Sequence, residues 1–367
     1  MQRSPLFAKL QAANARFMSH QGWEIPASFG SASGSAGSPS DLVEAEYRAL
    51  KEGAGLLDLS PRGLILASGK DAPRFLHGMI SNDVKGLEIG RGNYAFLLDV
   101  HGHILADLQI LRTGDTSFLL ICDPQLTEVI LKTLRRYIIA DVVKLEDQSA
   151  QTACVALEGP CAREVLRKAI DFDPPQMHPL EHLHLDALPA RLIHASFAGE
   201  EGFWILCAPD QATEVWQKSL EAEPALGLQP AGWEALEIRR IEAGIPRYGA
   251  DITEKNLPQE TGQMQAFSFT KGCYIGQEVV ERIRSRGHVN RMLAGLLLEG
   301  EQNVPPGTEI VAGDKTVGAI TSSVYSLGLR RNIALGYLRR EHAEAGKQVM
   351  AGTVPAEVAA LPFSSLP

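Results

Sequence analysis

The chain has 367 residues, of which 45% are hydrophobic and 22% are charged. This composition is typical of a folded globular protein, excludes disordered and collagen-like classes, and at about 150 residues per domain predicts two to three domains. The 35 basic and 44 acidic side chains leave a net charge of −9, which disfavours general binding to nucleic acid or to an anionic membrane, so we expect neither as a partner.

The N-terminal residues 1–16 carry basic side chains but lack the apolar core of a secretory signal. The sequence also has no run of roughly 18 apolar residues that would make a transmembrane helix. We therefore predict a cytoplasmic protein. Residues 30–40 are mostly glycine and serine and predict a flexible loop. A helix is expected to follow, with Asp41 as its N-cap and Gly53 at its end.

Strands and helices then alternate along the chain. A hairpin of residues 94–99 and 104–111, turning at 101–103, precedes a strand at 117–122 and a helix at 126–138. A similar set follows, with a strand at 152–157, a helix from Pro160, a hairpin of 191–197 and 203–207, and helices around 215–220 and over 232–245. Hairpins that alternate with helices indicate an α+β fold with mostly antiparallel sheets.

The helical period disappears after Asn290. Residues 293–357 are short apolar runs broken by glycine and proline, which is typical of a small all-β barrel. We therefore predict a boundary near residue 288, with an α+β region at 1–288 and a barrel at 289–367.

Three patterns suggest common kinds of site, but their context argues against each. Residues 90–95 read Gly-Arg-Gly-Asn-Tyr-Ala, yet a strand follows the glycines where a nucleotide-binding loop needs a helix. His178, His182 and His184 have no acidic or cysteine partner at fixed spacing, so a solvated loop is favoured over a metal site. The five cysteines form no Cys-x-x-Cys pair, so we predict neither a disulfide framework nor a metal or iron–sulfur site held by this chain alone.

The segment 271–278, Lys-Gly-Cys-Tyr-Ile-Gly-Gln-Glu, is the strongest candidate for chemistry. Lys271 and the start of a following helix would both favour Cys273 as a thiolate. Gly272 and Gly276 would let the backbone turn or come close to a ligand. A buried, inert cysteine at a tight turn explains the pattern equally well.

Residues 281–291 form a basic segment in an otherwise acidic chain. The segment holds four arginines and one glutamate, a net charge of +3. Such a run is typical of a solvated face, and it also suits an anion such as a carboxylate or a phosphate.

Several segments resemble the YgfZ-type folate-binding proteins, which are relatives of the glycine-cleavage T-protein, an aminomethyltransferase. The Lys-x-Cys-Tyr-x-x-Gln core at 271–277 is similar to the YgfZ-type signature, and residues 244–246, 257–260 and 286–291 resemble further segments of it. The T-protein likeness covers nearly the whole chain, and residues 240–244 resemble its Leu-Arg-Leu-Glu-Ala-Gly helix. The resemblance implies a ring of three subdomains around a folate cavity, two of them α+β and the last a β-barrel.

The resemblance also implies a tetrahydrofolate site. Glu200 occupies the place of the glutamate that pairs with the pterin ring in the T-protein, and a carboxylate accepts two parallel N–H bonds from such a ring edge. The helix arginine of the family corresponds to Arg240, which lies beside an apolar stripe and is expected to be buried with an anion. The implied folate-binding residues are Glu200, Arg240, Asp107, Tyr274 and Gln277, and the implied functional centre is Cys273 with Lys271.

Two working positions of the T-protein differ in this chain. Its catalytic aspartate, the first of an Asp-Asp pair on the second hairpin strand, corresponds to Ala106, and only Asp107 of the pair is present. Alanine cannot position an amine or support its protonation changes. The family's Asn-Ala-Ala-Asn segment is Cys-Asp-Pro at residues 122–124. The sequence therefore favours a binding protein over an enzyme.

The leading hypothesis, implied by the resemblance, is a tetrahydrofolate-binding protein that acts in iron–sulfur cluster assembly or repair. It would support cluster enzymes such as the radical enzymes that modify tRNA, with iron–sulfur client or assembly proteins as partners. The alternative is a folate-dependent aminomethyl or one-carbon transferase that uses Asp107 or Asp83 in place of the missing acid. A scaffold with an empty cavity is the third hypothesis, and it predicts no folate binding.

Overall fold

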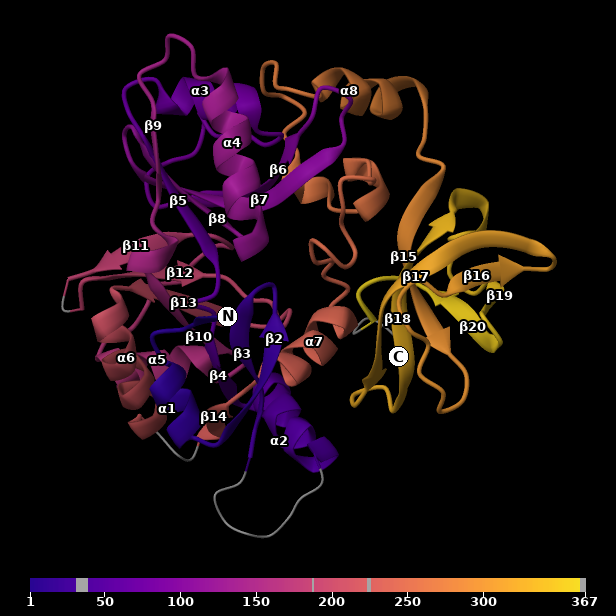
Figure 1. Cartoon of the computed structure of the whole chain (residues 1–367), viewed down its shortest axis with the longest axis horizontal. Helices are drawn as coiled ribbons and strands as arrows, with labels where there is room; N and C mark the ends of the chain where they lie inside the picture. The colour runs from indigo at the N-terminus through magenta and orange to yellow at the C-terminus, as the bar shows by residue number, and fades with distance from the viewer. Residues whose placement is uncertain (31–38, 187, 223–225, 364–367) are drawn as a thin grey trace. The chain divides into compact units, whose positions relative to one another are not determined.

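The computed structural model describes residues 1–30, 39–186, 188–222 and 226–363 (Figure 1). The chain divides into two compact units. Unit 1 comprises residues 1–77, 83–94 and 108–239, and unit 2 comprises residues 78–82, 95–107 and 240–367. No helix in these described ranges is long and apolar enough to cross a membrane.

Unit 1 holds a small N-terminal sheet and a larger mixed sheet (Figure 1). The small sheet has the order β1-β3-β2 and is formed by β1 Gln2–Arg3, β2 Ala15–His20 and β3 Trp23–Phe29, with α1 at Phe7–Ala12. The larger sheet has the order β11-β12-β13-β10-β4-β14 and is formed by β4 Ala54–Asp58, β10 Ala153–Glu158, β11 His182–Leu185, β12 Ala190–His194, β13 Gly202–Cys207 and β14 Leu228–Pro230.

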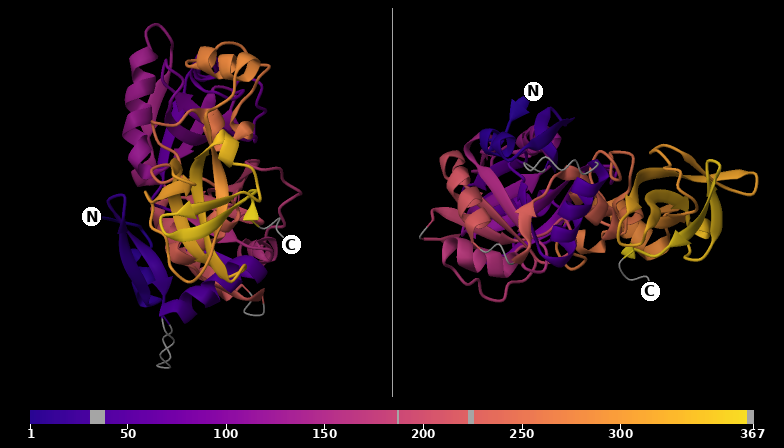
Figure 2. Two further views of the ribbon diagram at one scale, coloured as in Figure 1. Left: turned by 90° about the vertical axis from the view of Figure 1, so that its right-hand side faces the viewer. Right: turned by 90° about the horizontal axis from the view of Figure 1, so that it is seen from below.

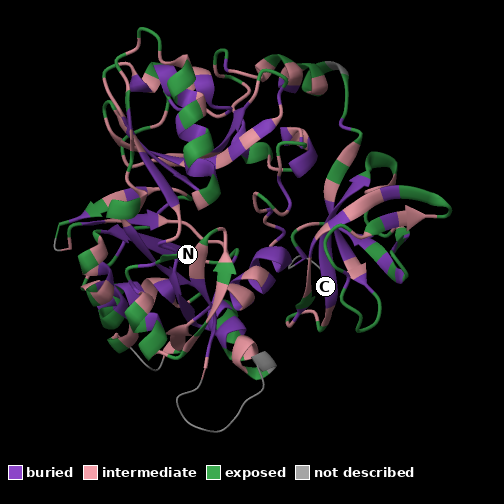
Figure 3. Cartoon of the chain, viewed as in Figure 1, coloured by how far each residue is buried: buried purple, intermediate pink, exposed green. Residues whose placement is uncertain are grey.

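Helices cover the larger sheet and bury its central strands. The helices are α2 Pro39–Glu52, α5 Ala162–Ile170 and α6 Pro209–Glu221, and α7 follows β14 at Trp233–Glu242. Every residue of β10 and β13 is buried, and the interior of the molecule is mostly purple, the colour of buried residues, in Figure 3. Val155, Leu166 and Trp216 belong to the core between this sheet and α5 and α6. Strands covered on both faces lose the in–out alternation of half-exposed strands, which is why β10 and β13 read as continuous apolar runs.

The third sheet has the order β6-β7-β8-β5-β9. Its strands are β5 Gly63–Ser68, β6 Gly92–Leu98, β7 Ile104–Gly114, β8 Ser117–Cys122 and β9 Lys144–Asp147, and its helices are α3 Ala72–Met79 and α4 Thr127–Tyr137. The hairpin of β6 and β7 turns at 99–103, where the Asp99 N–H donates to the His103 carbonyl at 3.0 Å. The sequence predicted this hairpin, and strand β6, which begins at Gly92, confirms that Gly90 and Gly92 do not open a helix.

Unit 2 contains a closed barrel with the strand order β15-β18-β17-β16-β19-β20, drawn in orange and yellow in Figure 2. Its strands are β15 Arg291–Leu298, β16 Glu309–Ala312, β17 Lys315–Ser326, β18 Arg331–Arg339, β19 Gln348–Ala351 and β20 Val354–Ala359, and α8 precedes it at Gln277–Arg286. Short 3₁₀ turns lie at Pro124–Leu126, Ser149–Gln151, Pro258–Thr261, Met264–Ala266 and Arg340–His342. Leu296, Ile320 and Leu338 are among the side chains that fill the barrel.

The α+β class with a C-terminal barrel is therefore confirmed, while several boundaries differ. Helix α2 begins at Pro39, so Asp41 lies inside it and is not its N-cap. Helix α5 begins at Ala162, two residues after Pro160. Most of the predicted glycine- and serine-rich loop lies outside the described residues. The boundary near residue 288, with ranges 1–288 and 289–367, and the arrangement of subdomains around a cavity stay predictions.

Candidate functional site

Glu200 lies in the turn that joins β12 to β13 in unit 1. Gly199 before it has φ of +79°, a left-handed conformation that glycine adopts without strain. The Glu200 side chain is 42% exposed, and its Oε1 accepts a hydrogen bond from Arg239 Nη2 at 2.8 Å. This places a half-exposed carboxylate at the tip of the turn, held in one orientation by a cation.

Arg239, in α7, was missed at the sequence level. Its side chain is only 6% exposed, and its guanidinium carbon lies 5.6 Å from the centre of the Tyr47 ring. The likeness to the T-protein drew attention to the next residue, Arg240. Two consecutive helical residues point about 100° apart, so a pair of arginines on an apolar helix was a signal that each needs its own anion.

Glu158 fixes the segment that leads into this turn. It ends β10, is fully buried, and accepts hydrogen bonds from Ala198 N at 2.7 Å, Ser196 Oγ at 2.9 Å, Phe197 N at 3.0 Å and Trp204 Nε1 at 3.3 Å. Burial raises the pKa of this carboxyl, and the hydrogen bonds oppose that rise. Glu158 therefore holds residues 196–198 in place directly before Gly199.

A second ion pair holds the turn at Glu201. Arg163 donates to Glu201 Oε1 from Nε at 2.9 Å and from Nη2 at 2.7 Å. The same guanidinium donates from Nη1 to the carbonyls of Pro174 at 2.8 Å and Pro175 at 3.1 Å. The backbone of the turn is thus restrained independently of the Arg239 contact.

Glu46 connects α2 to the start of α7. Its carboxylate is buried and accepts hydrogen bonds from the Phe29 N–H and, at 2.8 Å, from the Gly232 N–H. Gly232 directly precedes α7, where N–H groups lack helical partners and a negative charge is favourable. Burial nevertheless raises the pKa of Glu46 to about 7.

This shift predicts a pH-dependent stability. The folded chain holds the Glu46 proton up to a pH of about 7, whereas the unfolded chain loses it near the ordinary value of 4.5. Between these values the unfolded state binds fewer protons, so the free energy of unfolding falls as pH rises, by up to about 3 kcal/mol from this residue. Denaturant titrations of wild type and Glu46→Gln across this range should show the decline in wild type and a flatter profile in the variant. Parallel profiles would contradict the assignment.

Unit 2 contains a buried ion pair of Arg240 and Asp251. Their side chains are 3% and 0% exposed, and Arg240 Nη1 lies 2.7 Å from Asp251 Oδ2. Arg240 also donates to the Ile245 carbonyl at 2.7 Å and to Ser322 Oγ at 3.1 Å. The expected burial with an anion is observed. The predicted contact of Arg240 with folate stays a prediction, and these acceptors within unit 2 favour a structural role.

Lys271 is a structural cation in unit 2. Its Nζ donates to the carbonyls of Ile80 at 2.5 Å and Asn82 at 2.9 Å and lies 4.9 Å from the centre of the Tyr274 ring. Cys273 is exposed, so the interpretation as a buried turn cysteine is wrong. Cys273 makes no hydrogen bond or ion pair with any residue in the described ranges. The predicted functional roles of Lys271 and Cys273 stay predictions.

The rest of the signature shapes the entry into α8. Gly276 has φ of +83°, and a Cβ there would lie 2.7 Å from the Asp99 carbonyl oxygen, so glycine is required. Gly272 has open space around it and no positive φ, so no turn in the described structure requires glycine there, and its close approach to a ligand stays a prediction. Tyr274 is buried, which raises the pKa of its phenol. Gln277 is the first residue of α8.

Ala106 and Asp107 are neighbours on β7 in unit 2. Ala106 is fully buried, and Asp107 is partly exposed, because successive side chains of a strand point to opposite faces of the sheet. Tyr248 lies close enough to Asp107 that burial, and then the Asp107 charge, raise the pKa of the tyrosine to about 12. Asp107 is therefore a carboxylate beside a phenol.

Asp83, the other acid considered at the sequence level, is engaged in its own turn. Its Oδ1 accepts the Gly86 N–H at 2.9 Å and lies 3.2 Å from His77 Nδ1. These contacts give Asp83 a local structural role in unit 1.

Of the three clustered histidines, His178 and His184 are exposed as predicted, whereas His182 differs from the predicted solvated loop. His182 belongs to β11, is buried, and lies with Nδ1 2.8 Å from Arg191 Nη1. Burial, helped by the nearby Arg191 charge, lowers its pKa to about 4. No group of three or more His, Cys, Asp or Glu side chains suited to a metal occurs among the described residues.

The basic segment 281–291 is partly neutralised within unit 2. Arg284 lies 3.2 Å from Glu281 and stacks over the Phe269 ring at 4.6 Å. Arg291 lies 3.0 Å from Glu260. A solvated face explains this segment better than a dedicated anion site.

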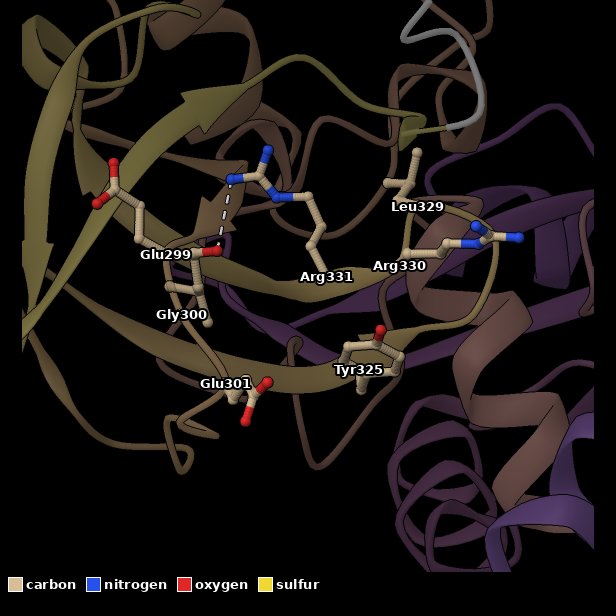
Figure 4. Close-up of a pocket in the computed structure, with 8 residues that line it drawn as sticks. Glu299, Gly300, Glu301, Tyr325, Leu329, Arg330 and Arg331 are labelled. Carbon is tan, nitrogen blue, oxygen red and sulfur yellow. Dashed lines mark hydrogen bonds between the residues drawn. The ribbon is translucent and has the colours of Figure 1, made fainter.

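A shallow depression of about 740 Å³ lies on the barrel (Figure 4). It is lined by Leu298, Glu299, Gly300, Glu301, Tyr325, Leu329, Arg330 and Arg331. In Figure 4 the guanidinium groups of Arg330 and Arg331 point to different sides, and Arg331 donates to the Leu298 carbonyl at 3.4 Å. The depression contains none of the predicted site residues, and its mixed charges do not converge on one ligand.

Comparisons with known proteins cover the whole chain. Residues 6–271 match the family described as the GCVT N-terminal domain, and residues 291–364 match the glycine cleavage T-protein C-terminal barrel domain. The aminomethyltransferase of Thermus thermophilus is 32% identical over 373 residues, with 100% of both chains covered. That of Bacillus subtilis is 29% identical over 372 residues, with 99% of both covered. The crystal structure of glycine cleavage system aminomethyltransferase T from Bartonella henselae covers 99% of this chain and 98% of its own, with a TM-score of 0.88 at 24% identity, which shows a shared fold.

Proposed function

Because the chain belongs to the glycine cleavage T-protein family, we propose that it is a folate-dependent aminomethyl or one-carbon transferase. The observation that carries this proposal is the extent of the match, since relatives named aminomethyltransferase align with essentially the full chain. Tetrahydrofolate is the cofactor that membership of this family implies. The Lys-x-Cys-Tyr-x-x-Gln segment supports placing the chain in the YgfZ-type branch of the family.

The iron–sulfur role expected from the sequence is wrong. That expectation came from the YgfZ-type segments at 244–246, 257–260, 271–277 and 286–291, whereas the full-length relatives and the matching fold are those of aminomethyltransferases. The expected iron–sulfur partners and the link to tRNA modification have no support apart from that role.

The cytoplasmic location stays a prediction. The interval between the end of α8 at Arg286 and the start of β15 at Arg291 supports the proposed boundary near residue 288.

The residues of unit 1 fit one end of tetrahydrofolate. The half-exposed Glu200 carboxylate is fixed by Arg239 through a single oxygen. A carboxylate offers about four lone-pair sites, so two parallel N–H donors of an aminopyrimidine ring can still bind. Bound tetrahydrofolate would supply the nitrogens that accept the transferred carbon.

Asp107 is the residue we assign to proton transfer. An aminomethyl donor releases its amine only when that amine is protonated, and a positioned carboxylate contributes to such steps by about 100-fold or more. Asp107 is partly exposed, whereas Ala106 at the family's catalytic position has no ionisable group. Asp107 directly follows the family's catalytic position on β7, whereas Asp83 lies in a separate turn with Gly86 and His77, which favours Asp107 as the candidate.

The test is an assay of purified full-length chain with tetrahydrofolate and an aminomethyl donor. Wild type should form methylene-tetrahydrofolate and ammonia in equal amounts. Asp107→Asn should lower kcat by about 100-fold while the KM for tetrahydrofolate changes little, because the amide keeps the shape and loses the titratable group. Asp83→Asn is the matched control and should retain most activity. Absence of product with wild type would refute the proposed function, and an active Asp107→Asn would refute the role of Asp107.

A further inference from the structure

We propose that Arg239 is a positioning residue that fixes the Glu200 carboxylate for recognition of the pterin ring. The inference rests on the proposed function, because it concerns how the same site binds tetrahydrofolate. Residues 240–244 resemble the last five residues of the T-protein helix pattern Leu-Arg-Leu-Glu-Ala-Gly. Arg239 therefore stands where that pattern has its first leucine.

Arg239 is itself held firmly before any ligand binds. It belongs to α7, its side chain is 6% exposed, and its guanidinium lies over the Tyr47 ring at 5.6 Å. Gly232, the residue directly before α7, donates its N–H to Glu46 at 2.8 Å. A cation with so little rotational freedom loses little entropy when it binds its partner, so it can impose an orientation on a mobile carboxylate.

The orientation of the Glu200 carboxylate depends on the contact with Arg239, whereas the backbone of the turn has other restraints. Glu158 and Arg163 restrain the backbone at residues 196–198 and at Glu201. The Glu200 carboxylate has Arg239 as its one side-chain partner among the described residues. Without Arg239, the turn would keep its shape while the carboxylate became free to rotate.

The geometry also leaves room for the ligand. Arg239 contacts Oε1 through a single nitrogen, which uses one of about four lone-pair sites on the carboxylate. Oε2 and the second lone pair of Oε1 remain for two parallel N–H donors. The guanidinium therefore orients Glu200 and does not compete with an aminopyrimidine edge.

The experiment is a calorimetric titration of tetrahydrofolate into the full-length chain. Arg239→Met keeps the length of the apolar stem and removes the charge, and it should raise the Kd about tenfold, as expected for loss of one charge-assisted positioning bond. Arg239→Lys should restore most of the affinity, because the contact is made by one nitrogen and a point charge can replace it. A thermal melt of each variant confirms that the chain remains folded.

Two controls separate positioning of Glu200 from general stabilisation of the turn. Arg163→Met removes the matching ion pair at Glu201 and should leave the Kd within about twofold. In the Glu200→Gln background, Arg239→Met should have almost no further effect, because residues that act as a unit are not additive.

The outcomes distinguish this inference from the proposed function. If wild type binds tetrahydrofolate and Arg239→Met binds equally well, the inference is overturned and the function stands. Full additivity with Glu200→Gln, or an equal loss in Arg163→Met, overturns it as well. If wild type itself binds no tetrahydrofolate, both are overturned.

Discussion

Replacing Asp251 with alanine should lower the free energy of unfolding by about 3 to 5 kcal/mol, because it leaves a buried guanidinium without its anion. Asp251 is fully buried, and its carboxylate accepts hydrogen bonds from Arg240 Nη1 at 2.7 Å, Thr321 Oγ1 at 2.6 Å and Ser322 Oγ at 2.7 Å. These donors come from α7 and β17, so one side chain joins the helix end to the barrel within unit 2. Equilibrium denaturation of wild type and Asp251→Ala measures the difference.

The double variant Arg240→Met with Asp251→Ala is the control. Replacing both members of a buried ion pair by apolar groups is often nearly neutral, so the double variant should recover a large part of the loss. A change below about 1 kcal/mol in Asp251→Ala alone would contradict the buried pair. If the double variant also binds tetrahydrofolate with the Kd of wild type, the folate contact implied for Arg240 is wrong and its role is structural.

Local signals in the sequence predicted much of the fold. The turn at 101–103 and the apolar runs beside it predicted β6, β7 and β8, because hairpin pairing depends on neighbouring residues. Regular glycine and proline breaks after Asn290 predicted the barrel in the same way. The small sheet β1-β3-β2 was not predicted, because β1 has two residues and pairs in parallel with β3 some twenty residues away. Such pairing leaves almost no local pattern.

The candidate site was predictable only where one residue carries its own signal. Glu200 stands in a glycine turn and Arg240 in an apolar helix, and both were named from the T-protein likeness. Arg239 and Glu158 were missed because their roles depend on partners 39 and 38 residues or more away. Glu158 nevertheless closes an apolar strand whose every residue is buried, and a carboxylate there indicates a hidden set of donors.

Those donors make Glu158 the residue on which the shape of the candidate site depends most. Arg62 lies over Phe197 at 4.7 Å and over Trp204 at 5.4 Å, so its guanidinium packs against the rings of two residues that donate to Glu158. Replacing Glu158 with alanine removes the acceptor that the structure gives the Phe197 N–H and the Trp204 indole, and it leaves the Ala198 N–H with the Ser196 hydroxyl oxygen at 3.0 Å. Each unsatisfied buried donor costs about 1 to 3 kcal/mol, so a total loss of about 3 to 4 kcal/mol is expected after partial relaxation.

An effect of Glu158 substitution on tetrahydrofolate binding would distinguish Glu158 from a buried residue that contributes to stability alone. Because residues 196–198 lead directly into Gly199 and Glu200, Glu158→Gln should raise the Kd for tetrahydrofolate even where the chain stays folded, since the amide NH₂ faces N–H donors and displaces the segment. Ser219→Ala is the control, because Ser219 is equally buried and, among the described residues, its hydroxyl bonds only the Val215 carbonyl of its own helix, at 2.8 Å. Ser219→Ala should bind as wild type does. Wild-type affinity in a folded Glu158→Gln would mean that the turn forms without its buried carboxylate, and the preorganisation argued for Glu200 would then rest on Arg239 alone.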